Sequence, residues 1–357
     1  MRRPGRNTVV VGAGAIAQRV HLPCLIAHEG IGRVLVMDPD ERAMRRVTGI
    51  FPVEPYAGKL ADVPADLAVI CTPPRSHAAL VRAALTAGMD VICEKPLVTS
   101  AADATELVRL AQDKGKRLFP CYTNRFRPDV QRLRDLIRTG ELGVVSEVRA
   151  DWSRRAGVPA SAGGWESGVL WDLGSHLVDL ALWCTGWAGP VTAFARGVRP
   201  GPGSATPTAG WYGAGSPSAP PAIEYATVNC LAGFAAGTLS VRASWHGAVA
   251  TDSVTVRVCG SKATAELRTV FGFSPDRQTV AGPCLRVSDQ DGGGWRDVIA
   301  AQPRQPDEYL IQLDEALRLR AADQSRAAIR SVALGELFTR SLSEGGAVTA
   351  HLVEEGL

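Results

Sequence analysis

Short apolar runs that alternate with helical stretches restrict the fold of this chain more than any other feature. The runs occupy residues 8–11, 33–37, 67–71, 90–94 and 117–121. Segments with helical character, such as SHAALVRAALTAG and AADATELVRLAQDKG, separate them. Strands spaced by helices of this size form βαβ units, which build a parallel sheet with helices on both faces. The pattern therefore predicts a doubly wound α/β domain over residues 1–123.

The pattern changes after a predicted helix at residues 124–140. Later runs are longer and alternate apolar with polar residues, at 144–152, 223–231, 237–245 and 253–260. This alternation is typical of an antiparallel sheet with one covered face. We expect a second, α+β domain over residues 124–357 with a large, mostly antiparallel open sheet. The sequence leaves open whether the C-terminal helices pack back on the first domain.

A stretch dense in Gly, Pro, Ser and Ala interrupts the second domain at residues 197–221. Such a composition buries too little apolar area to hold a packed element, so we expect a flexible insertion. Trp211 and Tyr212 are exceptions within it. Two interpretations remain open, a variable surface loop and a lid whose aromatic pair touches a ligand.

The first apolar run leads into GAGAIA at residues 12–17, which has the G-x-G-x-x-[G/A] form. Its glycines allow a tight turn and a close approach of the backbone to a pyrophosphate at the N-terminus of the next helix. Because the motif follows a predicted strand and opens a helix, it predicts a dinucleotide site. The candidate binding residues of this loop are Gly12, Gly14, Ala15, Ile16 and Ala17.

The second predicted strand is followed by a carboxylate, Asp38. At this place an acidic side chain accepts hydrogen bonds from the adenosine ribose and repels a 2′-phosphate, so the sequence favours NAD over NADP. Arg42, Arg45 and Arg46 keep NADP open, because a nearby arginine can accommodate that phosphate. At their spacing, however, these arginines fit a solvated helix face better.

Two further polar stretches, residues 71–77 and 93–98, follow the third and fourth strands. Ligands of open α/β sheets bind at the carboxyl ends of strands. A cation at Lys95 would stabilise a reacting oxygen there, although a lysine after a strand is more often only solvent-exposed. These stretches add the cofactor candidates Thr72, Pro73, His77, Glu94 and Lys95.

Asp172 and His176 lie four residues apart in the apolar stretch 167–183. On an α-helix this spacing places two side chains on one face. A carboxylate beside an imidazole suits proton transfer at neutral pH, and it equally suits a surface ion pair. The sequence alone leaves both interpretations open.

Composition excludes several function classes. The 39 basic and 36 acidic residues give a net charge of +3 without a long basic run, which argues against nucleic acid or a membrane as the main partner. The eight cysteines form no C-x-x-C pair, so we expect buried thiols in a reducing compartment and no metal site. Without a signal-peptide pattern or a stretch of membrane length, we expect a cytoplasmic protein.

In their order and intervals, these motifs resemble the glucose-fructose oxidoreductase, inositol dehydrogenase and MocA (Gfo/Idh/MocA) family. The resemblance rests on the glycine motif, Thr72-Pro73-Pro74 with His77, Glu94-Lys95-Pro96, NRFRP at 124–128, and Asp172 with His176. It covers essentially the whole chain. It implies a Rossmann domain, hydride transfer at a secondary alcohol or ketone, usually of a sugar or cyclitol, and a C-terminal sheet that often mediates oligomerisation.

The resemblance also implies roles for individual residues. Lys95 would bind the reacting oxygen, His176 would exchange its proton, and Asp172 would orient His176 or hold a neighbouring hydroxyl, with the pair facing the interdomain cleft. A cis peptide is expected between Lys95 and Pro96. Candidate substrate contacts are Tyr122, Arg125, Trp152, Arg154 and Trp165.

The leading hypothesis is thus an NAD-dependent dehydrogenase of a sugar, aminosugar, cyclitol or sugar conjugate, with the direction open. The Ala-, Gly- and Arg-rich composition fits a GC-rich bacterial genome, where such enzymes often serve aminoglycoside or other antibiotic biosynthesis. The alternatives are a non-catalytic NAD(P)-binding regulator and an NADP-dependent ketosugar reductase. We expect a homodimer or homotetramer that forms through the C-terminal sheet. The sequence departs from the family at GGWESGVLWD, before and including Asp172, and at the insertion.

Overall fold

The computed structural model describes most of the chain, namely residues 5–155, 168–200, 224–247, 249–278, 282–289, 293–301, 303, 307–318 and 322–352. The chain divides into two compact units. The first consists of Met1–Thr123 with Asp307–Val332, and the second of Asn124–Pro306 with Ala333–Leu357. Each unit contains its own sheet.

The first unit contains a six-stranded sheet in the order β3-β2-β1-β4-β5-β6. Its strands are β1 Arg6–Val11, β2 Ile31–Met37, β3 Glu54–Pro55, β4 Leu67–Ile70, β5 Asp90–Glu94 and β6 Leu118–Cys121. All neighbouring strands are parallel, as predicted. The order reverses between β1 and β4, which is the point where such sheets bind ligands beyond their carboxyl ends.

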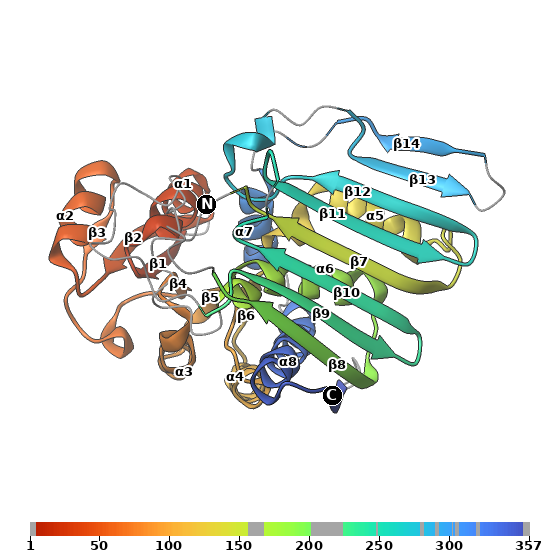
Figure 1. The fold of residues 1–357 in the computed structure, drawn as a ribbon. Coiled ribbons are helices and arrows are strands. Elements are labelled where there is room, and N and C mark those ends of the chain that lie inside the picture. The colour runs from red at the N-terminus through yellow and green to blue at the C-terminus, as the bar shows by residue number, and fades with distance from the viewer. Residues whose placement is uncertain are drawn as a thin grey trace. The chain divides into compact units, whose positions relative to one another are not determined.

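Helices cover both faces of this sheet, with α1 and α2 on one side and α3 and α4 on the other (Figure 1). The helical segments of the unit are η1 Ala17–His21, α1 Leu22–Ala27, α2 Glu41–Ile50, η2 Leu60–Asp62, η3 Pro74–Ser76, α3 His77–Thr86, α4 Ala101–Asp113, α7 Glu308–Arg318 and the first half of α8 Ala322–Glu344. Gly88 and Gly115 follow α3 and α4 with φ of +84° and +61°, the left-handed conformation predicted for helix ends. The Oγ of Ser100 accepts a hydrogen bond from the N–H of Asp103 at 3.3 Å, which caps α4.

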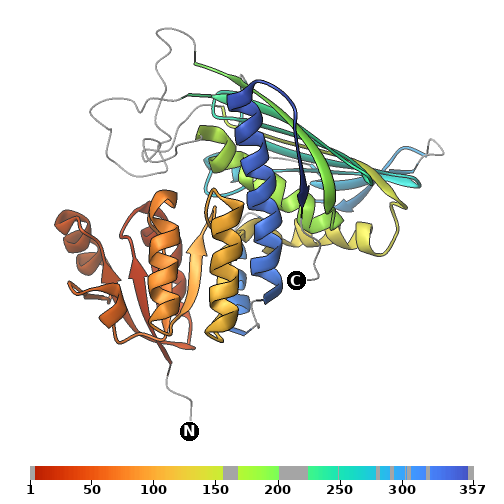
Figure 2. The ribbon, with the colours of Figure 1, turned by 90° about the horizontal axis from the view of Figure 1, so that it is seen from below.

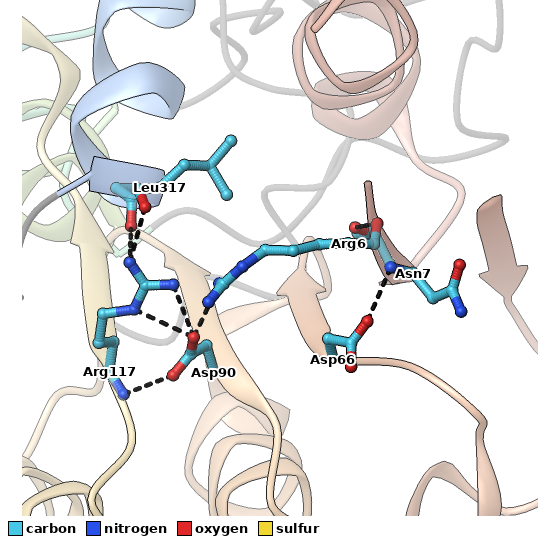
Figure 3. Close-up of polar contacts among 8 residues, drawn as sticks. Arg6, Asn7, Asp66, Asp90, Arg117 and Leu317 are labelled. Atoms are coloured by element: carbon cyan, nitrogen blue, oxygen red, sulfur yellow. Dashed lines mark hydrogen bonds and ion pairs between the residues drawn. The ribbon is translucent and has the colours of Figure 1, made fainter. Parts of the chain in front are cut away.

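Arg117 fastens α7 to the sheet of the same unit (Figure 3). Its Nη1 donates to the carbonyls of Ala316 and Leu317, at 3.2 and 2.8 Å, near the C-terminus of α7. Its Nη2 donates to Asp90 at 2.7 Å, and Arg6 donates to the same carboxylate oxygen at 2.7 Å. Burial alone would raise the pKa of Asp90, but the hydrogen bonds from both arginines hold it below its usual value. A guanidinium at a helix C-terminus satisfies carbonyls that have no partner within the helix.

The second unit contains a nine-stranded sheet in the order β14-β13-β12-β11-β7-β10-β9-β8-β15. Its strands are β7 Val145–Ser153, β8 Gly189–Val198, β9 Thr227–Phe234, β10 Gly237–Ser244, β11 Ser253–Gly260, β12 Ala263–Thr269, β13 Leu285–Asp289, β14 Trp295–Ile299 and β15 Val348–Leu352. Only β7 and β10 pair in parallel, and the other seven pairs are antiparallel. The predicted fold class is thereby confirmed.

One face of the nine-stranded sheet is covered by helices. Figure 2 shows α5 and α6 on the same side of it. The helical segments of this unit are η4 Thr123–Phe126, α5 Pro128–Arg138, η6 Leu170–Gly174, α6 Ser175–Thr185, η8 Pro275–Gln278 and the second half of α8 Ala322–Glu344. Along β11, Val254, Val256 and Val258 are buried whereas Thr255 and Arg257 are partly exposed, which matches the predicted alternation.

Parts of the sequence interpretation lie outside the described residues or need correction. The runs singled out in the sequence did not include β3, β8 or β12 to β15. Gly197 and Val198 belong to β8, so the insertion predicted from residue 197 begins too early. Residues 201–221, with Trp211 and Tyr212, lie outside the described residues. Within the described part of the chain, none of the helices combines the length and hydrophobicity that a bilayer crossing requires.

Candidate functional site

The loop after β1 has the shape that a dinucleotide requires. Gly12 has a φ of +98°, and a Cβ there would lie 2.9 Å from the carbonyl carbon of Cys71, so only glycine fits. Apart from its two neighbours in the chain, no described residue has a heavy atom within 4 Å of the place where a Cβ of Gly14 would be. That space allows a pyrophosphate to approach the backbone, and the buried Ala17 begins the helical segment behind it.

Asp38 is held beside this loop. Its Oδ2 accepts a hydrogen bond from the N–H of Ala13 at 2.7 Å, and its Oδ1 accepts one from Asp40 at 2.8 Å. The carboxylate therefore lies at the carboxyl end of β2 against the glycine loop, where an adenosine ribose binds in Rossmann domains. Arg42, Arg45 and Arg46 are exposed on α2, and Arg45 pairs with Glu41 at 3.1 Å.

Asp38 predicts a preference for NAD. We expect NAD to bind at least about tenfold more tightly than NADP, because the carboxylate repels the 2′-phosphate. Asp38→Asn keeps an acceptor for the N–H of Ala13 but removes the charge, so it should narrow this difference. Fluorescence titration with both cofactors measures the two dissociation constants, and Arg45→Gln serves as a control on α2. Tighter binding of NADP by the unmodified protein would contradict the prediction.

His77 joins the loops that follow β4 and β5. The imidazole is fully buried, with Nε2 2.8 Å from the carbonyl oxygen of Thr72 and Nδ1 2.8 Å from that of Pro96. Burial lowers the pKa of His77, although both carbonyls favour the protonated form. The loop with Pro73 and the Glu94-Lys95-Pro96 turn are thus fixed to each other. Because the imidazole of His77 is fully buried between these carbonyls, it connects the two loops from inside the unit.

The Glu94-Lys95-Pro96 turn contains the expected cis peptide between Lys95 and Pro96. One carboxylate oxygen of Glu94 lies 2.8 Å from Nε2 of His21, and the other accepts from the N–H of Lys95 at 3.1 Å. Burial disfavours a charged imidazole, but Cys71 and Glu94 beside it raise the pKa of His21 to about 10. Burial likewise opposes ionisation of Glu94, yet the hydrogen bond from His21 lowers its pKa. Lys95 therefore directly follows a glutamate, Glu94, that is held in a largely buried ion pair with His21.

Sequence analysis missed this pair because its members come from distant segments. One ligand atom each of His21, Glu94 and Cys121 lies within 4.8 Å of the other two, a spacing that a metal ion could also accept. The hydrogen bond between His21 and Glu94 already satisfies both groups. Charge complementarity in the β5 turn explains the cluster without a metal.

The pair between His21 and Glu94 predicts how stability changes with pH. The raised pKa of His21 adds stability that is complete below about pH 6.5 and is lost as the pH rises towards 10. The lowered pKa of Glu94 adds stability above about pH 4.5 that is lost in acid. We expect His21→Gln to flatten the decline in the free energy of unfolding from neutral to alkaline pH. Urea titrations measure this slope, with the exposed His351→Gln as a control, and equal slopes in both variants would contradict the prediction.

In the second unit, His176 is the most accessible position of a buried helical stretch. All residues from 168 to 182 are buried except His176, which is partly exposed. Its Nδ1 lies 3.3 Å from Nδ2 of Asn124, and its ring lies 5.5 Å from that of Trp152, between centroids. A partly exposed imidazole on an apolar helix is suited to meet a ligand.

Asp172 is not part of a surface ion pair, which corrects one of the two sequence interpretations. Its side chain is 2% exposed, and its Oδ2 accepts hydrogen bonds from Arg154 at 3.0 Å and Trp245 at 2.8 Å. The turn that contains it, η6, is π-helical, so the α-helical spacing assumed from the sequence does not apply there. Asp172 is anchored to the residues that directly follow β7 and β10, Arg154 and Trp245.

The predicted substrate contacts are buried where they are described. Arg125 forms a buried ion pair with Asp179, and Arg154 forms the one with Asp172. Tyr122 and Trp152 are buried hydrophobic residues, and Trp165 lies outside the described residues. The structure thus assembles two groups of candidates. The first unit holds Gly12, Gly14, Ala15, Ile16, Ala17, Asp38, Thr72, Pro73, His77, Glu94, Lys95 and Tyr122, and the second holds Arg125, Trp152, Arg154, Asp172 and His176.

Comparison with known proteins decides the family. Residues 6–122 match the model described as "Oxidoreductase family, NAD-binding Rossmann fold", and residues 130–266 match the "GFO/IDH/MocA C-terminal domain". The chain belongs to the Gfo/Idh/MocA family. It is therefore an oxidoreductase with an NAD-binding Rossmann domain, and the resemblance inferred from its motifs is confirmed.

Individual relatives support the same assignment. A protein of Amycolatopsis mediterranei (strain S699), with the provisional name UDP-kanosamine synthase oxidoreductase subunit, is 32% identical over 286 residues, which cover 76% of this chain and 77% of that protein. D-glucoside 3-dehydrogenase of Escherichia coli (strain K12) is 32% identical over 195 residues, 51% of this chain and 54% of that enzyme. The structure of GenD2 from gentamicin A biosynthesis, in complex with NAD, has 22% identity, a TM-score of 0.76 and 98% coverage of both chains. The last comparison shows the shared fold.

Proposed function

We propose that this member of the family transfers a hydride between NAD and a secondary alcohol or ketone of a sugar, aminosugar, cyclitol or sugar conjugate. The observation that carries the proposal is the partly exposed imidazole of His176 on an otherwise buried helical stretch. The glycine loop with its open space at Gly14 supports NAD as the partner of this chemistry. An inert regulator would need no titratable group in such a place.

Three side chains divide the work in this proposal. In the oxidative direction, His176 accepts the hydroxyl proton, and the ammonium of Lys95 stabilises the developing negative charge on the same oxygen. Asp172 is anchored by Arg154 and Trp245, so we assign it a positioning role and not the proton transfer. Bound NAD supplies the acceptor or donor of the hydride. Reduction uses the same groups in reverse.

Relatives narrow the substrates worth testing. The names of two of them refer to UDP-kanosamine and to a D-glucoside, and a structural neighbour belongs to gentamicin A biosynthesis. We therefore place nucleotide-linked aminosugars, glucosides and aminoglycoside-like compounds first. A role in antibiotic biosynthesis is part of this proposal.

A turnover screen tests the proposed function. The purified protein is supplied with NAD or NADP and with sugars, inositols, nucleotide-linked aminosugars and aminoglycoside-like conjugates, and the absorbance of the reduced nicotinamide is followed. Turnover that requires His176 supports the proposal. Tight binding of NAD with no turnover of any compound class, in either direction, would contradict it and leave the family assignment standing.

We further propose a cytoplasmic homodimer or homotetramer that forms through the face of the nine-stranded sheet opposite α5 and α6. Leu231, which is 50% exposed, and the partly exposed Phe194 lie on this face at paired positions of β9 and β8. All eight cysteines carry free thiols, which supports a reducing compartment. Light scattering of the purified protein measures the assembly.

A further inference from the structure

We propose that Asn124 is a positioning residue, whose side-chain amide holds Nδ1 of His176 so that Nε2 is the nitrogen that exchanges the substrate proton. This inference rests on the proposed function of His176. It concerns a residue that the sequence motifs included only as part of NRFRP, without a role of its own.

The imidazole of His176 is bounded by two side chains from other elements. Asn124, in η4, is 4% exposed, and its Nδ2 lies 3.3 Å from Nδ1 of the imidazole. The indole of Trp152, in β7, is tilted by 45° to the imidazole at 5.5 Å. An amide at one ring nitrogen and an aromatic ring nearby restrict the rotation of the imidazole.

A buried ion pair fixes Asn124 in this place. The next residue, Arg125, donates through Nε to Asp179 at 2.8 Å and through Nη2 to the other carboxylate oxygen, and both side chains are almost fully buried. Asp179 lies three residues after His176 on α6, so η4 is attached to the same helix at neighbouring turns. A bidentate pair fixes the relative position of its two side chains. Because desolvation offsets much of the attraction between buried charges, this positioning is its main effect.

An amide suits this place because it both donates and accepts. With Nδ2 facing the ring, as in this structure, it donates to an unprotonated Nδ1, and the proton of the neutral imidazole is then on Nε2, so this arrangement does not accept the substrate proton. Turned by 180°, it presents Oδ1 and accepts from a protonated Nδ1. In that arrangement Nε2 carries the lone pair that takes the hydroxyl proton, and the imidazolium that results keeps its hydrogen bond to Oδ1. Asn124 therefore accommodates both protonation states of His176 without adding charge.

Three of the described arginines on neighbouring elements form ion pairs, and a fourth, Arg134, stacks on an aromatic ring. Arg154 at the end of β7 pairs with Asp172, and Arg125 pairs with Asp179. Arg127 stacks on Phe271, which contacts Trp152, and it forms a buried ion pair with Asp129. Arg134 of α5 stacks on Trp183 of α6. A carboxylate introduced at position 124 would therefore act on His176 as an additional negative charge.

The test compares Asn124→Asp and Asn124→Leu with the unmodified protein. Nitrogen-15 NMR of labelled histidine reports the tautomer and pKa of His176, and its signal is assigned by its loss in His176→Gln. We expect Asn124→Asp to raise the pKa of His176 by about one unit or more and to favour the Nδ1–H tautomer. The pH profile of kcat in oxidation should move to higher pH by the same amount. Asn124→Leu should lower kcat by about tenfold or more with NAD binding unchanged.

A matched control is Asn229→Asp, at an exposed position of β9. It makes the same change of amide to carboxylate and should leave the pKa of His176 and the pH profile unchanged. An unaltered pKa and tautomer in Asn124→Asp would overturn the inference. Because NMR needs no turnover, a shifted pKa without activity on any substrate would refute the proposed reaction and uphold the contact. Turnover that requires His176, with no pKa shift of His176 in Asn124→Asp, would uphold the proposed reaction and refute the role of Asn124.

Discussion

We expect His176→Gln to lower turnover by about a hundredfold or more while the affinity for NAD stays unchanged. Glutamine retains polarity and similar volume but cannot accept a proton at neutral pH, so the proton-transfer step loses its base. The cofactor loop and Asp38 belong to the first unit and the substitution to the second, so NAD binding provides an internal reference. Steady-state kinetics with the substrate found in the screen measure kcat and KM.

The exposed His351→Gln is the control for this experiment, because it removes an imidazole on β15 that has no part in the mechanism. Its kcat should equal that of the unmodified protein. A His176→Gln variant with nearly normal kcat would refute proton transfer by His176. The fold and the family would be unaffected by that result.

Lys95→Met should be similarly damaging, with a loss of kcat of about a hundredfold or more. Methionine keeps the length of the side chain and removes the ammonium that stabilises the developing alkoxide. The double variant with His176→Gln should be much less impaired than the product of the two single losses, because the proposed mechanism assigns both groups to one oxygen. Kinetics of the four proteins complete the cycle.

Losses that multiply in the double variant would show that the two residues act in independent steps. Thermal unfolding of each variant serves as the control for stability, since Lys95 follows the buried pair of Glu94 and His21. A large fall in melting temperature for Lys95→Met would show that the loss of kcat comes from a destabilised Glu94-Lys95-Pro96 turn. An unchanged melting temperature with low kcat would assign it to the reaction.

The first unit could be predicted in detail because its signals are local. Buried parallel strands form continuous apolar runs, and the ends of α3 and α4 carry their own glycines, Gly88 and Gly115. The glycine of the cofactor loop is equally local, since its positive φ requires glycine whatever lies nearby. Strands towards the edges of the second sheet were harder to predict from the sequence. Runs rich in small or polar residues have a weak preference for strand, and they form strands because they pair with neighbouring strands.

The candidate site could be predicted by residue type but not by contact. Asp172 has two hydrogen-bond partners from distant parts of the chain. Arg154 lies 18 residues away in the sequence, and Trp245 lies 73 residues away. Asn124 is 52 residues from His176, and its role follows only from the fold. The π-helical turn at Asp172 also defeats the rule of α-helical spacing. Sequence motifs indicate which residue types take part in the chemistry, whereas the contacts of these residues depend on partners far away in the sequence.

The attachment of α7 by Arg117 affects how this protein is made. The guanidinium reaches carbonyls 199 and 200 residues further along the chain, so the Rossmann unit lacks a helix until the segment from residue 307 has left the ribosome. Nascent domains otherwise fold as soon as they emerge, and closing so long a loop adds an entropic cost. We therefore expect the side of α1 that contacts α7 to stay uncovered while residues 124–306, with eight of the nine strands of the second sheet, are synthesised. Shortened forms that stop at the end of β6 should for this reason need chaperones and aggregate readily.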